Sequence, residues 1–352
     1  MNGHAARASG VIEIDGAHGE GGGQLVRTAV ALSAITGKAM RLVDARARRD
    51  KPGLAPQHLA AVRAVATVCD ADTEGLQLGA TTFAFSPRAL KGGAYRFDIG
   101  TAGSITLVLQ ALLPVLVASE AHVQVLVTGG TDVRQAPPAD YLVEVLARHL
   151  ARMGARVRLT IPRRGYYPRG GGEIAAEIVP GVLHASRLSK PGALRHWQGI
   201  AHVANLPAHI AERMRGAVLA QFAGFGANGR IAVRVLGGSE AIGQGGAIVA
   251  WAETEHTVLG AARVAERGVR AETLGEAVGH ELRADLDAGA TTDVHAADQL
   301  LVYLALVRGE SSFLTRELTS HAQTAMWLIS RFLPVRFATE QREGLFHIKV
   351  MR

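Results

Sequence analysis

Short apolar runs and amphipathic stretches follow one another along this chain in an order that repeats. A strand pattern, a glycine-rich turn and a helix pattern come first, followed by a strand, a second helix and a hairpin. In the first copy these elements are predicted at residues 10–15, 24–35, 39–45, 56–69, 73–78 and 82–86. Recurrence of one supersecondary unit is typical of folds that stack that unit.

The same order returns twice more. The second copy is predicted at residues 95–99, 106–117, 123–128, 138–153, 156–161 and 173–178. The third begins near Asp293 with a helix that reaches Leu306 and continues at residues 312–317, 320–332, 335–339 and 346–350. The pattern therefore predicts an α/β (α+β) fold in which three βαβαββ units pack together.

Residues 186–286 interrupt this order. They read as strand, helix, two strands and helix, at residues 198–204, 208–222, 230–236, 247–254 and 272–286. Proline and glycine mark both ends of the stretch, as expected where a domain is inserted. We predict a disordered N-terminus at 1–10, a large catalytic domain at 11–185 and 287–352, and an inserted small α/β domain at 186–286.

Composition narrows the class of protein. Hydrophobic residues make up 48% of the chain, which is ordinary for a globular protein. Neither a membrane span nor the apolar region of a signal peptide is recognisable, so we expect no membrane contact. Cys69 is the single cysteine, which excludes an intramolecular disulfide and a cysteine-based zinc site and fits a reducing cytoplasm.

The charge adds a preference for a polyanion. The net charge is +7, and only five of the 38 basic residues are lysine. Arginine grips phosphate with a fixed fork of donors, although a high arginine content also arises from genome composition. The net charge itself favours a polyanionic partner such as nucleic acid.

The sequence does not match the common nucleotide-binding motifs. The run from Gly19 to Gln24 lacks the last glycine of a dinucleotide-binding loop, and Gly37-Lys38 is followed by Ala39, which excludes a P-loop. Asp15-Gly16 would fit a lysyl-AMP motif, but Glu13 occupies the lysine position. If the chain forms a covalent nucleotide, the nucleophile is therefore not expected to be lysine.

The glycine run still suits phosphate. Gly21-Gly22-Gly23 lets the backbone approach a phosphate at the positive end of the helix that follows. Glu20 within the run could hold Mg²⁺ or Mn²⁺ against phosphate oxygens. The alternative is an acidic residue that merely favours the helix start.

Two basic stretches have two interpretations each. Residues 44–53 carry four cations and form either a phosphate-binding loop or a solvated turn. Residues 163–172 interleave arginines with Tyr166 and Tyr167. Arginine for phosphate and aromatic rings for bases would fit RNA, whereas a hairpin turn with exposed tyrosines fits equally well.

His321 is the sharpest candidate nucleophile. Thr319 and Ser320 can cap the helix that follows, whose apolar residues have helical spacing. A ring at this helix start lies where a phosphate would be stabilised, and the positive helix end favours the neutral imidazole. A structural histidine is the alternative, since 13 other histidines are present.

At these residues the chain resembles the RNA 3′-terminal phosphate cyclase family. The likeness runs from about Ile12 to Phe337 and rests on ordered blocks. These blocks are 15–24, Lys51-Pro52-Gly53-Leu54 with Gln57-His58, Gly100-Thr101-Ala102-Gly103-Ser104, 129–132 with 136–140, 165–168 with 170–172, and Ala297-Asp298-Gln299-Leu300.

The resemblance implies roles for individual residues. It implies that His321 accepts AMP and that Glu20 meets the metal. It implies ATP contacts at Gln110, His295, Ala296, Ala297, Asp298 and Gln299. It implies that Arg27, Arg46 and Arg49 lie near the triphosphate or the RNA end. Ala325 and the pair Ala55-Pro56 depart from the pattern of relatives, and the inserted domain matches less well.

The implied activity is ATP-dependent conversion of an RNA 3′-phosphate to a 2′,3′-cyclic phosphodiester through histidyl-AMP and an RNA-adenylate anhydride. The chain is compatible with a homodimer. Two alternatives stay open. An enolpyruvyl transferase would use similar repeated units without ATP or a histidine nucleophile, and a non-catalytic RNA-binding relative in ribosome assembly would lack that histidine.

Overall fold

The chain begins with a four-stranded sheet and two helices. The computed structural model describes residues 10–225 and 229–352, so the predicted disordered segment 1–10 lies outside it except for Gly10. The first elements are β1 (Ile12–Asp15), α1 (Gly23–Thr36), β2 (Met40–Val43), α2 (Pro56–Val68), β3 (Asp72–Glu74) and β4 (Phe83–Ser86). The strand order is β1-β2-β4-β3, with β1 and β2 parallel because α1 crosses between them.

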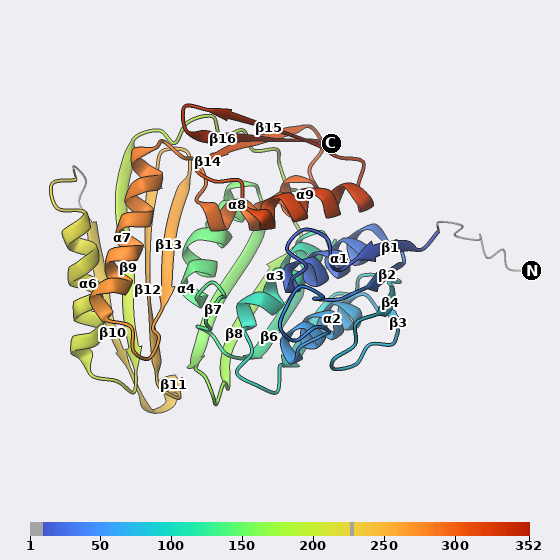
Figure 1. Cartoon of the computed structure of the whole chain (residues 1–352), viewed down its shortest axis with the longest axis horizontal. Helices are drawn as coiled ribbons and strands as arrows, with labels where there is room; N and C mark the ends of the chain where they lie inside the picture. The colour runs from blue at the N-terminus through green and yellow to red at the C-terminus, as the bar shows by residue number, and fades with distance from the viewer. Residues whose placement is uncertain (1–9, 226–228) are drawn as a thin grey trace, which may run out of the picture.

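A second section supplies four strands of a five-stranded sheet and its own helices (Figure 1), and the fifth strand, β11 (Ala241–Ile242), comes from later in the chain. Its elements are β5 (Gly93–Asp98), α3 (Ile105–Val117), β6 (Val123–Gly129), α4 (Ala139–Tyr141), α5 (Ala147–Arg152), β7 (Arg156–Gly165) and β8 (Gly172–Val179). The single helix predicted at 138–153 is interrupted by a π-helical turn, η1 (Leu142–Leu146). A π-turn differs from an α-turn by one residue, a change too small for apolar periodicity to reveal.

A third section closes the chain with a three-stranded antiparallel sheet in the order β14-β16-β15. Its elements are α8 (Val294–Leu304), β14 (Glu310–Thr315), α9 (Ser320–Phe332), β15 (Arg336–Arg342) and β16 (Leu345–Met351). The order of the first two sections is strand-helix-strand-helix-strand-strand, and the third begins directly on its helix.

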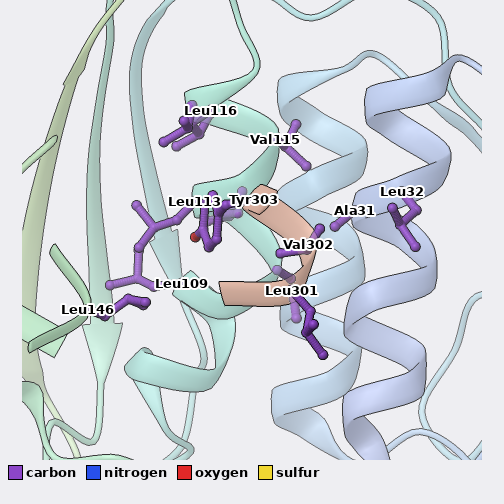
Figure 2. Close-up of a cluster of buried hydrophobic side chains, with 14 of the residues drawn as sticks. Ala31, Leu32, Leu109, Leu113, Val115, Leu116, Leu146, Leu301, Val302 and Tyr303 are labelled. Atoms are coloured by element: carbon purple, nitrogen blue, oxygen red, sulfur yellow. The ribbon is translucent and has the colours of Figure 1, made fainter. Parts of the chain in front are cut away.

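The helices of the three sections meet in one core. Helix α1 packs against α2, α3 and α9, and α8 packs against α9. Figure 2 shows Leu32 of α1, Leu109 and Leu113 of α3 and Tyr303 of α8 in this core, and all four are buried. Almost every side chain of α3 is buried, because helices surround it and only an apolar helix can occupy that place. This packing brings the starts of α1 and α9 together.

The stretch between the second and third sections has a separate core. Its elements are β9 (Leu194–Ala204), α6 (Ala208–Gln221), β10 (Gly229–Leu236), η2 (Gly238–Glu240), β11 (Ala241–Ile242), β12 (Gly245–Thr254), β13 (Val258–Val264) and α7 (Ala271–Asp287). The sheet order is β10-β9-β12-β13, and α6 and α7 pack together over it. Strand β13 was not predicted, because glycine and alanine in Val258–Val264 weaken its apolar alternation.

None of the helices described is both long enough and apolar enough to span a lipid bilayer.

Candidate active site

The glycine run before α1 leaves room for three functional side chains. A Cβ atom on Gly22 would lie 2.0 Å from Oε1 of Glu20 and 2.6 Å from a guanidinium nitrogen of Arg49. A Cβ atom on Gly23 would lie 2.0 Å from Nε2 of His58. Any side chain at these positions would displace the charged groups. The glycines therefore serve to gather a carboxylate, a guanidinium and an imidazole at the start of α1.

His321 lies in the first turn of α9, opposite this run. Thr319 caps the helix by accepting a hydrogen bond from the Ala322 amide at 2.9 Å, as its sequence position predicts. Nδ1 of His321 lies 2.7 Å from Oε2 of Glu20, whose Oε1 lies 3.0 Å from Nη2 of Arg49. The contact is an ion pair when the imidazole is protonated. Two residues from opposite ends of the chain thus form one ion pair.

The expected effect of the helix dipole on His321 is opposed by a nearby carboxylate. The contact with Glu20 raises the pKa of His321, against the opposing effect of partial burial. A full negative charge at 2.7 Å outweighs the partial positive charge of a helix end. For Glu20, burial raises the pKa, but His321 and Arg49 outweigh it and the pKa is lowered overall. The carboxylate therefore stays ionised and ready to hold positive charge.

Arg27 is a buried cation beside this pair. Its Nη2 donates a hydrogen bond to Oε1 of Gln110 at 3.3 Å, while its Nε has no partner. In residues 10–225 and 229–352 no carboxylate lies within ion-pair distance of Arg27. Burial lowers the pKa of Arg27 to about 10, so it remains charged at neutral pH. A buried guanidinium without an anion is a site for one.

A pocket joins several of the residues that the sequence singled out. Arg27, Gln110, Asp298 and Gln299 line it together with Gln24, Thr28, Leu146, Val302, Tyr303 and Ala325. Asp298 accepts a hydrogen bond from the Thr319 hydroxyl at 2.5 Å and so connects the pocket to the cap of the His321 helix. Burial raises the pKa of Asp298 to about 6, against the lowering effects of Thr319 and His321.

The predicted run from His295 to Gln299 divides between two environments. Asp298 and Gln299 face the pocket, whereas the side chains of Ala296 and Ala297 are buried in the core. Nε2 of His295 lies 3.1 Å from Oε1 of Glu281 in α7. That contact raises the pKa of His295 to about 8. His295 therefore joins α8 to the inserted stretch.

The His295 contact is expected to make stability depend on pH. The folded pKa of about 8 exceeds the ordinary value of 6.5, so the contribution is complete below pH 6.5 and is lost as the pH rises through 8. His295→Asn should lower Tm at pH 6 and leave it unchanged at pH 9. Thermal unfolding at both pH values checks this, with exposed His209→Asn as the control. A Tm loss that is equal at both pH values would contradict the assignment.

The basic loop before α2 contributes two of the three predicted arginines. Arg49 pairs with Glu20, and Nη1 of Arg46 donates a hydrogen bond to the Gly53 carbonyl at 2.7 Å. Burial, together with the charge of Arg49, lowers the pKa of Arg46. The loop is exposed over much of its length but is folded onto the glycine run, where Arg48 also donates to the Gly19 carbonyl at 2.7 Å.

His58 is a site residue to which sequence reasoning assigned no role. It is buried in α2, and its Nδ1 accepts a hydrogen bond from the Ala55 amide at 3.3 Å. Burial and the charges of Arg27, Arg46 and Arg49 lower its pKa to about 3, so the ring is neutral. The available signal was its place in the block Gln57-His58, which marks the start of α2.

The second basic stretch is only partly exposed. Arg164 is buried between two carboxylates, with Nη1 3.2 Å from Asp132 and Nη2 2.7 Å from Asp140. The Tyr166 hydroxyl lies 2.9 Å from Nε2 of buried His202 in β9. The interpretation of Arg164 and Tyr166 as RNA contacts is therefore wrong, because both serve an internal polar network.

Asp132, Asp140 and His202 are close enough to one another to hold a metal ion. The guanidinium of Arg164 already lies against both carboxylates and supplies the positive charge that a cation would bring. This cluster, here called the ionic joint, is therefore a buried network of charged and polar side chains that links the second section to the inserted stretch.

Breaking the ionic joint should greatly lower the free energy of unfolding. Arg164→Met would leave two buried carboxylates facing each other, and we expect the free energy of unfolding to fall by about 3–5 kcal/mol. Denaturant titration measures this fall. The neighbouring Arg163→Met breaks a half-exposed pair with Glu173 and should cost no more than about 1 kcal/mol. Equal losses for the two variants would contradict a special role for Arg164.

The sequence is also similar to that of known proteins. The sequence model of the family described as RNA 3′-terminal phosphate cyclase matches residues 18–339. A protein of that name from Nitrosospira multiformis is 51% identical over 338 residues, which cover 96% of each chain. One from Pyrobaculum neutrophilum is 42% identical, over 96% of this chain and 98% of its own. One from Methanopyrus kandleri is 42% identical, over 95% and 96% respectively. With the family model and these relatives spanning nearly its whole length, the chain belongs to the RNA 3′-terminal phosphate cyclase family.

Proposed function

We propose that this protein uses ATP to convert an RNA 3′-phosphate into a 2′,3′-cyclic phosphodiester, with His321 as the residue that carries AMP. The observation that carries the proposal is the pairing of Nδ1 of half-exposed His321 with Glu20, next to the pocket of Arg27 and Gln110. In its neutral form with the proton on Nδ1, on the side of Glu20, the ring has a free lone pair on Nε2. That nitrogen is then the nucleophile.

The proposed reaction has three steps. Nε2 of His321 attacks the α-phosphorus of ATP, a P–N bond forms, and the bond to pyrophosphate breaks. A 3′-phosphate oxygen of RNA then attacks the same phosphorus, the P–N bond breaks, and an RNA-adenylate anhydride forms. Finally the neighbouring 2′-oxygen attacks the terminal phosphorus, loses its proton and expels AMP. The last step is intramolecular, so proximity supplies much of its rate.

Each site residue has a proposed part in this sequence. Arg27 would bind a phosphate group of ATP, because it is a buried cation that has no ion-pair partner among the residues that the structure describes. Arg49 and Arg46 would bind further phosphates of ATP or of the RNA end. Gln110, Asp298 and Gln299 would contact the rest of the nucleotide in the pocket that they line. Ala296 and Ala297 would contact the nucleotide only through their backbone atoms. His295 would contact it through its backbone, or through its ring if the ring leaves Glu281.

The site fits a divalent cation, Mg²⁺ or Mn²⁺, in the company of ATP. Glu20 remains ionised, and it lies beside His321, where the phosphates of ATP would come. A cation held by one carboxylate and several phosphate oxygens is the usual arrangement for Mg²⁺ in nucleotide sites. When bound, it would neutralise charge on the phosphates that the attack on the α-phosphorus must approach.

We also propose the predicted organisation for the whole chain. Two sections with the order βαβαββ and one with αβαββ support three repeated units in 11–185 and 287–352. The separate core of the intervening stretch supports an inserted domain at 186–286. A cytoplasmic location and a homodimer remain predictions.

One experiment tests the function most directly. The protein is incubated with α-³²P-ATP and a divalent cation, and the label is mapped after digestion. We expect an acid-labile AMP adduct on the peptide that contains His321. Cyclisation of a 3′-phosphorylated RNA without any labelled protein would contradict the histidyl route. RNA binding without label or cyclisation would favour the non-catalytic relative, and activity that requires no ATP would favour a transferase.

A further inference from the structure

The turn between β7 and β8 holds an aromatic side chain in solvent on a tightly built backbone. The Tyr166 carbonyl accepts a hydrogen bond from the Gly170 amide at 2.8 Å, and Nε of Arg163 donates to the Gly171 carbonyl at 3.1 Å. Tyr167, between these anchors, is 80% exposed. Its neighbour Tyr166 is buried, so the two tyrosines have separate roles. An exposed ring on a well-anchored turn is available to a planar partner.

A chain of close backbone contacts connects this turn to the candidate active site. A Cβ atom on Gly170 would lie 2.8 Å from the Thr101 carbonyl, so the turn rests on the loop before α3. That loop rests on α2, because the Ser104 amide donates to Oε1 of Gln57 at 3.2 Å. The next residue, His58, lies against Gly23 of the glycine run. Tyr167 therefore stands at the far end of a continuous set of elements that begins at Glu20 and His321.

Charge along these elements suits a polyanion. Arg169, two residues after Tyr167, is exposed and has no ion-pair partner in the parts of the chain that the structure describes. The nearby carboxylate of Glu173 is already paired with Arg163 at 2.9 Å. The basic loop, which is folded onto the glycine run, adds exposed Arg48 and Lys51 at the other end of these contacts. An extended chain of phosphates could thus meet cations at both ends of its path.

We propose that Tyr167 and Arg169 form a subsite for the RNA strand upstream of its 3′ end. Tyr167 stacks on a base, and Arg169 binds a backbone phosphate. Stacking on an aromatic ring accepts any base, so the subsite adds affinity without sequence preference. The inference rests on the proposed function, since it assumes that the RNA end lies at His321. It goes beyond that function by assigning the path of the strand away from the reacting phosphate.

Length dependence of RNA binding tests the subsite. With the 3′ end at His321, an octanucleotide extends further along the proposed path than a 3′-phosphorylated dinucleotide, so the subsite predicts that only the longer RNA gains affinity from Tyr167. We expect Tyr167→Ala to weaken octanucleotide binding about tenfold and to leave dinucleotide binding unchanged. Tyr167→Phe keeps the ring and should bind as the unaltered protein does. Arg169→Ala should reduce the slope of log affinity against log salt by about one.

Controls separate this subsite from the chemistry and from the fold. Arg230→Ala removes an exposed arginine from edge strand β10 of the inserted stretch and should change neither affinity nor salt slope. All variants should form the AMP adduct at the unaltered rate. Equal losses for both RNA lengths, or no loss in Tyr167→Ala, would overturn the subsite. If the unaltered protein binds RNA with this length dependence but takes no AMP, the subsite stands and the proposed function fails.

Discussion

His321→Asn is expected to abolish the transfer of labelled AMP from ATP to the protein, with a loss of at least about 1,000-fold, as removal of a nucleophile requires. Asparagine keeps the helix start and much of the shape of the ring, but its amide has no lone pair available for attack. Arg27, Gln110 and Asp298 do not change, so ATP binding should stay within a few fold. The measurements are the yield of acid-labile adduct and the dissociation constant for ATP.

A matched variant guards against a general loss of structure. His184 is an exposed histidine before the inserted stretch, and His184→Asn should label as the unaltered protein does. Thermal unfolding of both variants should be close to that of the unaltered protein, because His321 is half-exposed and its ion pair contributes little to stability. Adduct that persists on His321→Asn would show that another residue carries the nucleotide.

Arg27→Met is expected to weaken ATP use while stabilising the fold. The guanidinium is buried, has one hydrogen bond to Gln110 and lacks an ion-pair partner in residues 10–225 and 229–352. Its desolvation is a cost of folding that Glu20 and Gln110 offset only in part and that a bound phosphate would offset further. Removing the charge should lower kcat/KM for ATP by about 100-fold, the scale of a lost charge-assisted contact at a phosphate. The same change should raise Tm in the absence of ATP.

Arg27→Met is expected to lower kcat/KM for ATP and to raise Tm, and this combination distinguishes an anion-binding arginine from a structural one. A structural arginine would lower stability when it is lost, whereas an anion-binding arginine that is strained without its ligand would not. Steady-state kinetics and thermal unfolding with and without ATP provide the two readings. Arg41→Met, at an exposed position of β2, is the control and should change neither. A fall in Tm for Arg27→Met would assign Arg27 to the fold.

Much of the secondary structure follows from local pattern alone. Helix α9 begins and ends where the cap at Thr319 and the apolar spacing predict, and α1 ends at Gly37, whose φ of 68° suits glycine. The predicted helix at 106–117 is present as α3, and its nearly all-apolar sequence suits its place in the core, where most of its side chains are buried. Local signals suffice here because caps, turns and periodicity act within one or two turns of the chain.

Local pattern fails where the deciding partner is distant in sequence. Nothing near Arg164 indicates that Asp132 and Asp140 surround it, so a buried ionic joint looked like an RNA-binding stretch. In the same way, nothing near His295 indicates its contact with Glu281. The π-turn of Leu142–Leu146 was also missed, because it alters spacing by a single residue.

For the candidate site, residue types and capping marked His321 and Glu20 as separate candidates, and family resemblance gave them related roles. Their contact, and with it the raised pKa of the ring, depends on α1 packing against α9 in a shared core. A sequence determines which side chains a helix start presents. Which carboxylate meets which imidazole depends on how helices from different sections pack, because charge interactions act through space and not along the chain.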